Sequence, residues 1–428
     1  MIFLIPKVVF MTSKRNVIIV APWGYPPQWQ KSRYSVSLDD RGILIKDFEC
    51  QTCSSTISLA AALRERADID LRKIIIIGLD TVLSPKESPD GKSHRDKVKM
   101  WFRDVISELI DRKNCNCCDF LTEDLFDVII VPGIGTFYGY TFKGSVNHIF
   151  LRVFSEIARY LDDLIHVDVF LDTTHGVNYQ VIATLYATIA AIVSSDPELK
   201  IENRLFIMNS EPFPQGVKTS RCIQPLNLPT KPQNLRSIQT SEISQLPFLG
   251  IQNFSELHNA IRALRAITNL SMLDERPLKR FLSIIKRKSE LEEQLNRLTQ
   301  FFKYLRLGLA GLVYPHSNFE LNAYKINEMI ADFYAIARKE LTKDFTPHID
   351  HDRKIITYEN ASIHYALSKI LERIRQSIIE KLSNAKNINE FKKKLQEIYD
   401  KKNMKDKVFI IEREFYSLQE MLKMLEAS

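Results

Sequence analysis

Short apolar runs alternate with helical patterns through about residue 210, and this alternation constrains the fold more than any other feature of the sequence. It is typical of βαβ units, whose strands pair into a parallel sheet. The predicted strands are Asn16–Val20, Lys73–Leu79, Asp127–Val131, His166–Leu171 and Arg204–Met208. The predicted helices lie near Ser54–Arg66, Arg95–Arg112, Asn147–Asp163 and Asn178–Ser194. We therefore expect an α/β domain with a Rossmann-like sheet over residues 1–210.

The composition changes twice beyond this domain. Prolines, serines and threonines dominate from Pro212 to about Gly250, which predicts a connector over residues 211–255. Apolar residues then recur at helical spacing, as in Leu257, Ile261 and Leu264. The sequence therefore predicts an all-helical domain over residues 256–428, with an extension of unassigned role past about residue 375.

Small and polar residues follow the predicted strands at the point where each strand ends. In an open parallel sheet these ends lie at one edge, where a crevice and helix N-termini accept anionic ligands. The residues that we expect to bind a ligand there are Trp23, Gly24, Asp80, Thr81, Gly135, Thr136, Phe137, Thr174, His175, Gly176 and Asn178. A capped strand-to-helix turn without a ligand remains the alternative for the segment from Asp172 to Gln180.

The glycine-rich segment Pro132–Gly139 does not match a dinucleotide-binding fingerprint. Gly139 comes one position late, and the acidic Glu156 falls within a helical pattern, not at a strand end. The sequence therefore favours a polar ligand of another kind.

Charge and cysteine content leave two questions open. The net charge is +7, and the basic cluster between Arg276 and Lys288 favours a polyanion or forms a solvated helix face. The six cysteines are Cys50, Cys53, Cys115, Cys117, Cys118 and Cys222. The Cys-x-x-Cys at 50–53 could hold zinc with the second cluster, but the sequence has no second Cys-x-x-Cys. Loop disulfides or free thiols are favoured over zinc, and we expect no metal cofactor.

Two apolar segments bear on location and assembly. Met1–Met11 lacks a basic n-region and a small-residue cleavage site, so that we expect a cytoplasmic protein without a secretory signal and without membrane contact. The apolar run Val181–Val193 is too short to span a membrane. We expect it in a core or in the interface of a homodimer or higher homo-oligomer.

The strand-end residues resemble the CARF sensor domain of the CRISPR-associated CARF–HEPN ribonucleases of type III systems. The matching segments are Ala21–Gly24 with Trp29 close behind, Asp80–Thr81, Gly135–Phe137 and Asp172–Asn178. The resemblance implies a cyclic oligoadenylate activator, with the cyclic tetra-adenylate expected. It also implies a metal-independent endoribonuclease that is activated allosterically and cleaves single-stranded RNA.

The segment His316–Glu320 resembles the end of the HEPN ribonuclease signature, in which an arginine precedes the histidine by five to seven positions. This chain has Leu309, Ala310 and Gly311 there, and its nearest upstream arginine is Arg306. The resemblance implies that His316 transfers protons and that Arg306 holds the phosphate, if bending of the chain or a dimer partner brings an arginine close.

Two other classes of function remain open on the sequence. The helical half is either catalytic or a degenerate effector that acts as a regulator, which the absent arginine favours. Alternatively, the crevice itself is the active site of a nucleotide enzyme, including one that cleaves its own cyclic ligand. His348, Asp350 and His351 carry side chains that can bind a metal ion, but we expect a solvated stretch between helices there.

Overall fold

The computed structural model describes residues 14–36, 48–163, 167–195, 204–210, 289–307, 310–316, 320–341, 347–358, 368–369, 371–373, 375–401 and 416. They form two compact units. The first contains the described residues up to Ile189, residues 204–210 and the segment 347–358, and the second contains the described helices from Ser289 onward. The predicted connector over residues 211–255, the basic cluster and Cys222 lie outside the described residues.

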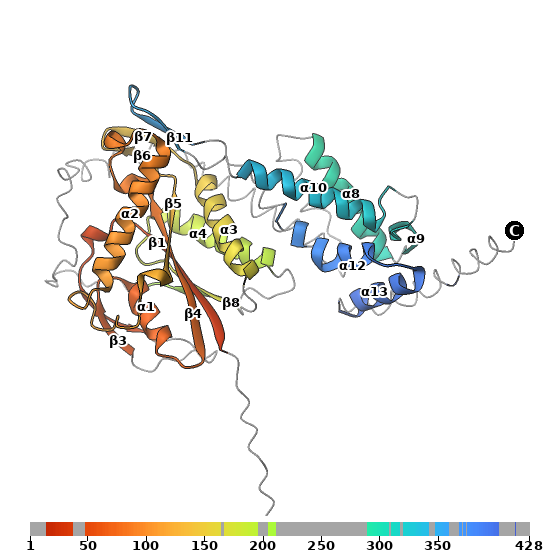
Figure 1. Cartoon of the computed structure of the whole chain (residues 1–428), viewed down its shortest axis with the longest axis horizontal. Coiled ribbons are helices and arrows are strands. Elements are labelled where there is room, and N and C mark those ends of the chain that lie inside the picture. Colours follow the sequence, from red (N-terminus) through yellow and green to blue (C-terminus); the bar gives the residue numbers. More distant parts are fainter. Residues whose placement is uncertain are drawn as a thin grey trace, which may run out of the picture. The chain divides into compact units, whose positions relative to one another are not determined.

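A parallel five-stranded sheet in the order β5-β4-β1-β8-β9 forms the centre of the first unit (Figure 1). Its strands are β1 (Arg15–Trp23), β4 (Ile69–Leu79), β5 (Phe126–Val131), β8 (Val167–Asp172) and β9 (Leu205–Met208). Its α-helices are α1 (Ser55–Arg64), α2 (Gly91–Ile110), α3 (Val146–Asp163) and α4 (Asn178–Ser195). Short 3-10 helices are η1 (Pro26–Gln28), η2 (Asp80–Val82), η3 (Pro85–Glu87) and η4 (Glu123–Leu125). The predicted α/β class with a Rossmann-like parallel sheet is confirmed.

Both faces of the sheet are covered, which explains why its strands read as continuous apolar runs. Val17, Ile19 and Ala21 of β1 share one core cluster with residues of α1 and α2, whereas α3 and α4 lie on the other side of the sheet (Figure 1). Ile18 and Val20, which alternate with them, are also fully buried. Burial of this sheet is the main source of stability in the first unit.

Three short antiparallel pairs accompany the main sheet. The strands β2 (Ser32–Val36) and β3 (Phe48–Thr52) pair with each other. A second sheet in the order β10-β11-β7-β6 contains β6 (Ile134–Phe137), β7 (Tyr140–Lys143), β10 (Pro347–Asp350) and β11 (Ile355–Tyr358). The hairpin of β10 and β11 thus joins the first unit although the helices before and after it belong to the second.

This hairpin corrects one expectation. The sequence indicated a solvated stretch between helices around His348, but residues 347–358 form two strands, and β11 pairs parallel with β7. Alternating half-polar strands of this length carry too weak an apolar signal to be found from the sequence.

The second unit is built from helices around its own core. The described helices are α8 (Ser289–Leu307), α9 (Ala310–Val313), α10 (Ala323–Leu341), the π-helix η7 (Arg375–Ile379), α12 (Glu380–Ser383) and α13 (Ile388–Lys401). Phe301, Ile330 and Phe391 are nearly completely buried where α8, α10 and α13 meet. None of the helices in the described part of the chain is long and apolar enough to cross a membrane.

Candidate functional site

The carboxyl ends of four parallel strands bring the predicted segments together at one edge of the sheet. The Gly24 amide donates a hydrogen bond to the carbonyl oxygen of His175 at 2.8 Å, which joins the ends of β1 and β8. The Gly133 amide donates to Oδ1 of Asp80 at 2.7 Å, which joins the ends of β5 and β4. The edge is therefore a connected set of turns.

Asp172 is the buried anchor of this edge. The hydroxyls of Ser55 and Thr56 donate to its Oδ2 at 2.6 and 2.7 Å, and the Thr174 amide donates to Oδ1 at 3.0 Å. Burial, followed by the nearby Asp172 carboxylate, raises the pKa of Tyr34 to about 12. Asp172 thus fixes the N-terminus of α1 against the turn that follows β8.

Trp23 is placed in the core and not on the crevice surface. Its side chain is completely buried, and its indole Nε1 donates to the Thr56 hydroxyl at 3.0 Å. Since that hydroxyl in turn donates to Asp172, Trp23 positions the carboxylate. A ligand that stacks on an aromatic ring at this edge would have to use another side chain.

His175 is held between an aromatic ring and a backbone amide. Its imidazole stacks on Trp29 with the ring centroids 4.1 Å apart, and its Nε2 accepts a hydrogen bond from the Ser55 amide at 3.3 Å. Burial lowers the pKa of His175, against the opposite effect of the Asp172 carboxylate. A neutral ring that accepts at Nε2 carries its proton on Nδ1, which makes Nδ1 a hydrogen-bond donor.

The turn from Thr174 to Asn178 leads into α4 with little free space. A Cβ on Gly176 would lie 2.5 Å from Cγ2 of Val181 and 2.9 Å from Cβ of Pro22, so that only glycine fits. The Thr174 hydroxyl accepts from the Ser210 amide at 3.0 Å. Asn178 is exposed and begins α4, whose first amides are suited to an anion.

Asp80 is a buried acid whose pKa is raised. It is 2% exposed, it accepts from the Tyr358 hydroxyl at Oδ2 and from the Gly133 amide at Oδ1, and burial raises its pKa to about 7. Thr81 beside it is also buried. Asp80 and Thr81 are therefore buried behind the strand-end edge, where Asp80 holds the Gly133 turn in place.

The segment Gly135–Phe137 is a strand and not the loop that the sequence indicated. It forms β6, which turns through Tyr138 and Gly139 into β7, and both turn residues have positive φ, at 53° and 76°. Two such residues suit the tight turns that join hairpin strands. Thr136 is exposed, and the Phe137 ring packs edge-on against Phe142 at 6.0 Å.

The groups that hold the predicted residues in place could be predicted from the sequence only in part. Ser55 and Thr56 stand at the start of a helical pattern, and this signal could have identified them as hydrogen-bonding groups near a strand end. Trp29 was noted only for its proximity to Trp23 in the sequence. Tyr358 gave no signal, since its partner Asp80 lies 278 residues away in the chain.

The predicted catalytic residues belong to the second unit. His316 is exposed, follows α9, and approaches the Ala385 carbonyl oxygen with its Nε2 at 3.1 Å. A ring nitrogen next to a carbonyl oxygen is the donor, which leaves Nδ1 of His316 as an acceptor. Arg306 lies in the last turn of α8, but its side chain lies outside the described residues, as does Leu309.

His351 of the β10–β11 hairpin makes structural contacts, whereas His348 is exposed. His351 contacts the Tyr140 hydroxyl through Nδ1 at 3.0 Å and the Ser88 carbonyl oxygen through Nε2 at 2.9 Å. Asp350 accepts from the Arg353 amide at 2.9 Å and closes the turn. Within the described residues, the group suited to a metal ion is instead Cys50, Cys115 and Cys117.

The fold is a Rossmann-like domain with a candidate ligand-binding edge, joined in one chain to a helical unit. Residues 18–212 match the family model described as CRISPR system endoribonuclease Csx1, CARF domain. The first unit is thus similar to the CARF domain of the CARF-containing ancillary nucleases of type III CRISPR systems, and the predicted resemblance is confirmed.

Two individual proteins are similar to this chain. The CRISPR system endoribonuclease Csx1 of Methanocaldococcus jannaschii is 29% identical over 204 residues, which is 46% of this chain and 37% of the relative. The match therefore spans little more than a third of that relative's length. A solved structure, Enterococcus italicus Csm6 bound to cyclic hexa-2'-fluoro-hexa-dAMP, is 9% identical, with 90% of this chain and 81% of that chain covered at a TM-score of 0.23. A likeness at that score supports no further argument.

Proposed function

We propose that the first unit senses a cyclic oligoadenylate and that the helical unit cleaves single-stranded RNA when the sensor is occupied. The proposed sensor spans residues 1–210 together with the β10–β11 hairpin, and the proposed effector lies within residues 256–428 after a connector over 211–255. The observation that carries the proposal is the turn from Thr174 to Asn178, in a domain that matches the Csx1 CARF model. It presents a neutral imidazole, an exposed amide side chain and the start of a helix at one edge.

Each of these groups suits one part of a cyclic oligoadenylate. The Nδ1 of His175 and the side chain of Asn178 can hydrogen-bond to phosphate oxygens or adenine edges, and the first amides of α4 favour a phosphate. Thr136 and Phe137 on β6 can close over a base. A cyclic tetranucleotide has approximate two-fold symmetry, so that two copies of the edge in a homodimer can bind it with repeated contacts.

The β10–β11 hairpin gives the proposal a route for activation. Tyr358 of β11 donates to Asp80 beneath the edge, and His351 contacts Tyr140 of β7, which follows the proposed binding strand β6. The hairpin lies between α10 and the π-helix η7 in the sequence. A ligand that prefers one arrangement of β6 and β7 therefore biases the segments attached to the hairpin, provided that its affinity differs between two states.

His316 supplies the proposed chemistry. Its Nδ1 accepts the proton of a ribose 2′-hydroxyl, whose oxygen attacks the adjacent phosphorus and displaces the 5′-oxygen of the next nucleotide. The products are a 2′,3′-cyclic phosphate and a 5′-hydroxyl, which takes up a proton. Arg306 or an arginine of the partner subunit stabilises the charge on the phosphate. These steps use no metal ion.

A degenerate effector is the second candidate. Leu309, Ala310 and Gly311 occupy the positions where the family signature has its arginine, and this observation favours a regulator that binds RNA or protein without cleaving it. In that case the sensor still binds the cyclic ligand.

One assay distinguishes these two candidates and also detects an enzyme that cleaves the ring. The full chain is incubated with labelled single-stranded RNA, with and without cyclic tetra-adenylate or cyclic hexa-adenylate, and both the RNA and the ring are followed. Ligand-stimulated RNA cleavage supports the ribonuclease. Binding of the ring without cleavage identifies the regulator, and cleavage of the ring alone identifies an enzyme whose active site is the crevice.

A further inference from the structure

Five of the six cysteines gather at one place in the first unit, although they come from two distant segments. Cys50 lies in β3 and Cys53 directly before α1, whereas Cys115, Cys117 and Cys118 lie in the loop between α2 and η4. Four of them, namely Cys50, Cys53, Cys115 and Cys118, are at most 3% exposed. The fold therefore brings the Cys-x-x-Cys segment and the second cysteine cluster together, which the sequence left open.

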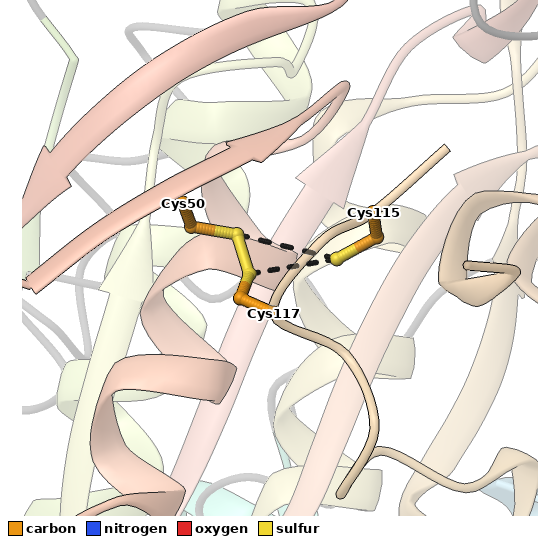
Figure 2. Close-up of side chains that lie close together, drawn as sticks. All are labelled: Cys50, Cys115 and Cys117. Carbon is orange, nitrogen blue, oxygen red and sulfur yellow. Dashed lines mark hydrogen bonds between the residues drawn. A yellow bond between two sulfur atoms is a disulfide. The ribbon is translucent and has the colours of Figure 1, made fainter. Parts of the chain in front are cut away.

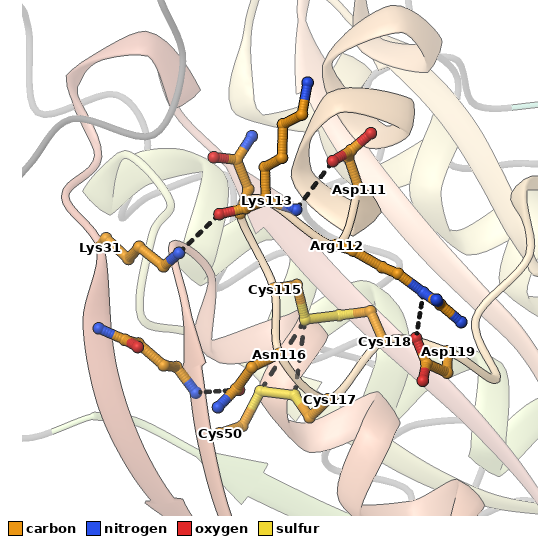
Figure 3. The surroundings of a disulfide bond; sticks show 12 residues. Lys31, Cys50, Asp111, Arg112, Lys113, Cys115, Asn116, Cys117, Cys118 and Asp119 are labelled. Atoms are coloured by element: carbon orange, nitrogen blue, oxygen red, sulfur yellow. Dashed lines mark hydrogen bonds and ion pairs between the residues drawn. A yellow bond between two sulfur atoms is a disulfide. The ribbon is translucent and has the colours of Figure 1, made fainter.

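The sulfur atoms form one cluster. Disulfides link Cys50 to Cys117 and Cys115 to Cys118 (Figure 3). Sγ of Cys115 also lies 3.5 Å from Sγ of Cys117 and 4.0 Å from Sγ of Cys50 (Figure 2). Sγ atoms of Cys50, Cys115 and Cys117 all lie within 4.8 Å of one another. Four thiolates at about 2.3 Å from a tetrahedral zinc ion are about 3.8 Å apart, close to the two longer distances.

We propose that, when a thiol reductant has reduced the two disulfides, Cys50, Cys115, Cys117 and Cys118 bind a structural zinc ion. Two short cysteine-containing segments far apart in the sequence are the usual framework of such a site. A thiol reductant first reduces the two disulfides, which take up four electrons and four protons and become four thiols. Each thiol then gives up its proton when zinc binds, so that ligation itself releases four protons and transfers no electron.

Hydrogen bonds hold the two segments in position around the sulfur atoms. The Gln51 amide donates to Oδ1 of Asn116 at 2.8 Å, and the Asn116 amide donates to the Gln51 carbonyl oxygen at 3.3 Å. The Cys115 amide donates to the Asp111 carbonyl oxygen at 2.9 Å. A site whose ligands are already fixed by the backbone binds the ion with less ordering cost.

The surroundings suit the charge of the site. A zinc ion with four thiolates carries a net charge of −2, and Lys31 and Lys113 lie beside the cluster, with Nζ of Lys31 donating to the Lys113 carbonyl oxygen at 2.8 Å (Figure 3). Arg112 is paired with Asp119 nearby. The Lys31 ammonium group supplies positive charge on this side of the site, which favours the anionic complex.

The site also lies next to the proposed sensor edge. Cys53 is two residues before Ser55, whose hydroxyl and amide contact Asp172 and His175. A metal ion bound to the Cys50–Cys53 segment would fix the start of α1 and, through it, the position of His175.

The test measures zinc and thiols on the same protein. The full chain is purified in reductant without chelator, zinc per chain is measured by mass spectrometry, and thiols are counted in denaturant before and after reduction. We expect about one zinc per chain and about a tenth of that or less in Cys50→Ser and Cys117→Ser. The matched control Cys222→Ser changes a cysteine outside the described residues and keeps the zinc.

Two further measurements keep the proposal falsifiable if a serine variant misfolds. Cobalt-loaded parent protein should show the absorption of a tetrahedral cobalt thiolate, and Cys117→His should recover zinc that Cys117→Ser loses, because imidazole is also a zinc ligand. Parent protein that holds no zinc after exposure to it in reductant, or whose zinc is unchanged in both serine variants, overturns the proposal. In the first case, a thiol count that rises by four or more on reduction identifies disulfides instead.

Discussion

Replacing Asp80 by asparagine should change the pH dependence of the stability of the first unit. Burial raises the pKa of Asp80 from its ordinary value of 3.8 to about 7 in the folded chain. The folded state therefore holds the proton more tightly than the unfolded state. The resulting stabilisation is complete below pH 3.8 and is lost as the pH rises through about 7.

The size of the effect follows from the two pKa values. One pKa unit is equivalent to about 1.4 kcal/mol, so that the whole difference corresponds to about 4 kcal/mol. Between pH 5 and pH 8 the parent protein should lose about 2–3 kcal/mol of its free energy of unfolding from this group alone. Asparagine keeps an oxygen for the Gly133 amide and an amino group for the Tyr358 oxygen, and it has no charge to bury.

The assay is urea denaturation at pH 5 and pH 8, followed by tryptophan fluorescence. All three tryptophans, Trp23, Trp29 and Trp101, lie in the first unit, so that the signal reports on that unit. We expect the stability of Asp80→Asn, relative to the parent, to rise by about 2–3 kcal/mol from pH 5 to pH 8. The control Asp104→Asn replaces an exposed acid on α2 and should show no such rise. A relative stability of Asp80→Asn that stays constant to within about 0.5 kcal/mol would refute the reasoning.

Three further predictions concern coupling, catalysis and assembly. Tyr358→Phe removes the hydroxyl that donates to Asp80, so that urea denaturation should show a loss of about 1–3 kcal/mol, and ligand stimulation of RNA cleavage should fall more than ligand affinity; unchanged stimulation would contradict the proposed route. His316→Ala should abolish stimulated cleavage without added metal and leave calorimetric ligand binding intact, and Arg306→Ala should lower the rate substantially; activity that survives both would place the chemistry elsewhere. Ile182 of α4 is 45% exposed, so that Ile182→Glu should shift a dimer toward monomer in light scattering, and a monomeric parent protein would contradict the interface.

The parallel sheet could be predicted because its strands are buried on both faces and therefore appear as uninterrupted apolar runs. Each of the five predicted strands corresponds to a strand of the sheet, although β4 begins at Ile69 and not at Lys73. The pairs β2–β3 and β10–β11 were missed, since their short half-exposed strands leave no clear period. Pairing between strands that are far apart in the sequence, as between β11 and β7, depends on tertiary packing.

The features of the candidate site could likewise be predicted from the sequence only in part. The turn from Thr174 to Asn178 was visible because glycine, threonine and histidine follow a strand and precede a helix. The buried roles of Trp23 and Asp80 were not, because burial at a strand end depends on which distant segment covers it, here Thr56 of α1 and Tyr358 of β11. The cysteine cluster needed the fold to show that Cys50 and Cys115 are neighbours.

The most direct test of the sensor is calorimetric titration of cyclic tetra-adenylate into the full chain and into His175→Ala. We expect the parent protein to bind about one ring per two chains, as a two-fold site requires. The variant should bind about 5- to 150-fold more weakly, which corresponds to the loss of a buried hydrogen bond of about 1–3 kcal/mol. An unchanged affinity in His175→Ala, or no binding of cyclic tetra-adenylate or cyclic hexa-adenylate by the folded parent protein, would contradict the account.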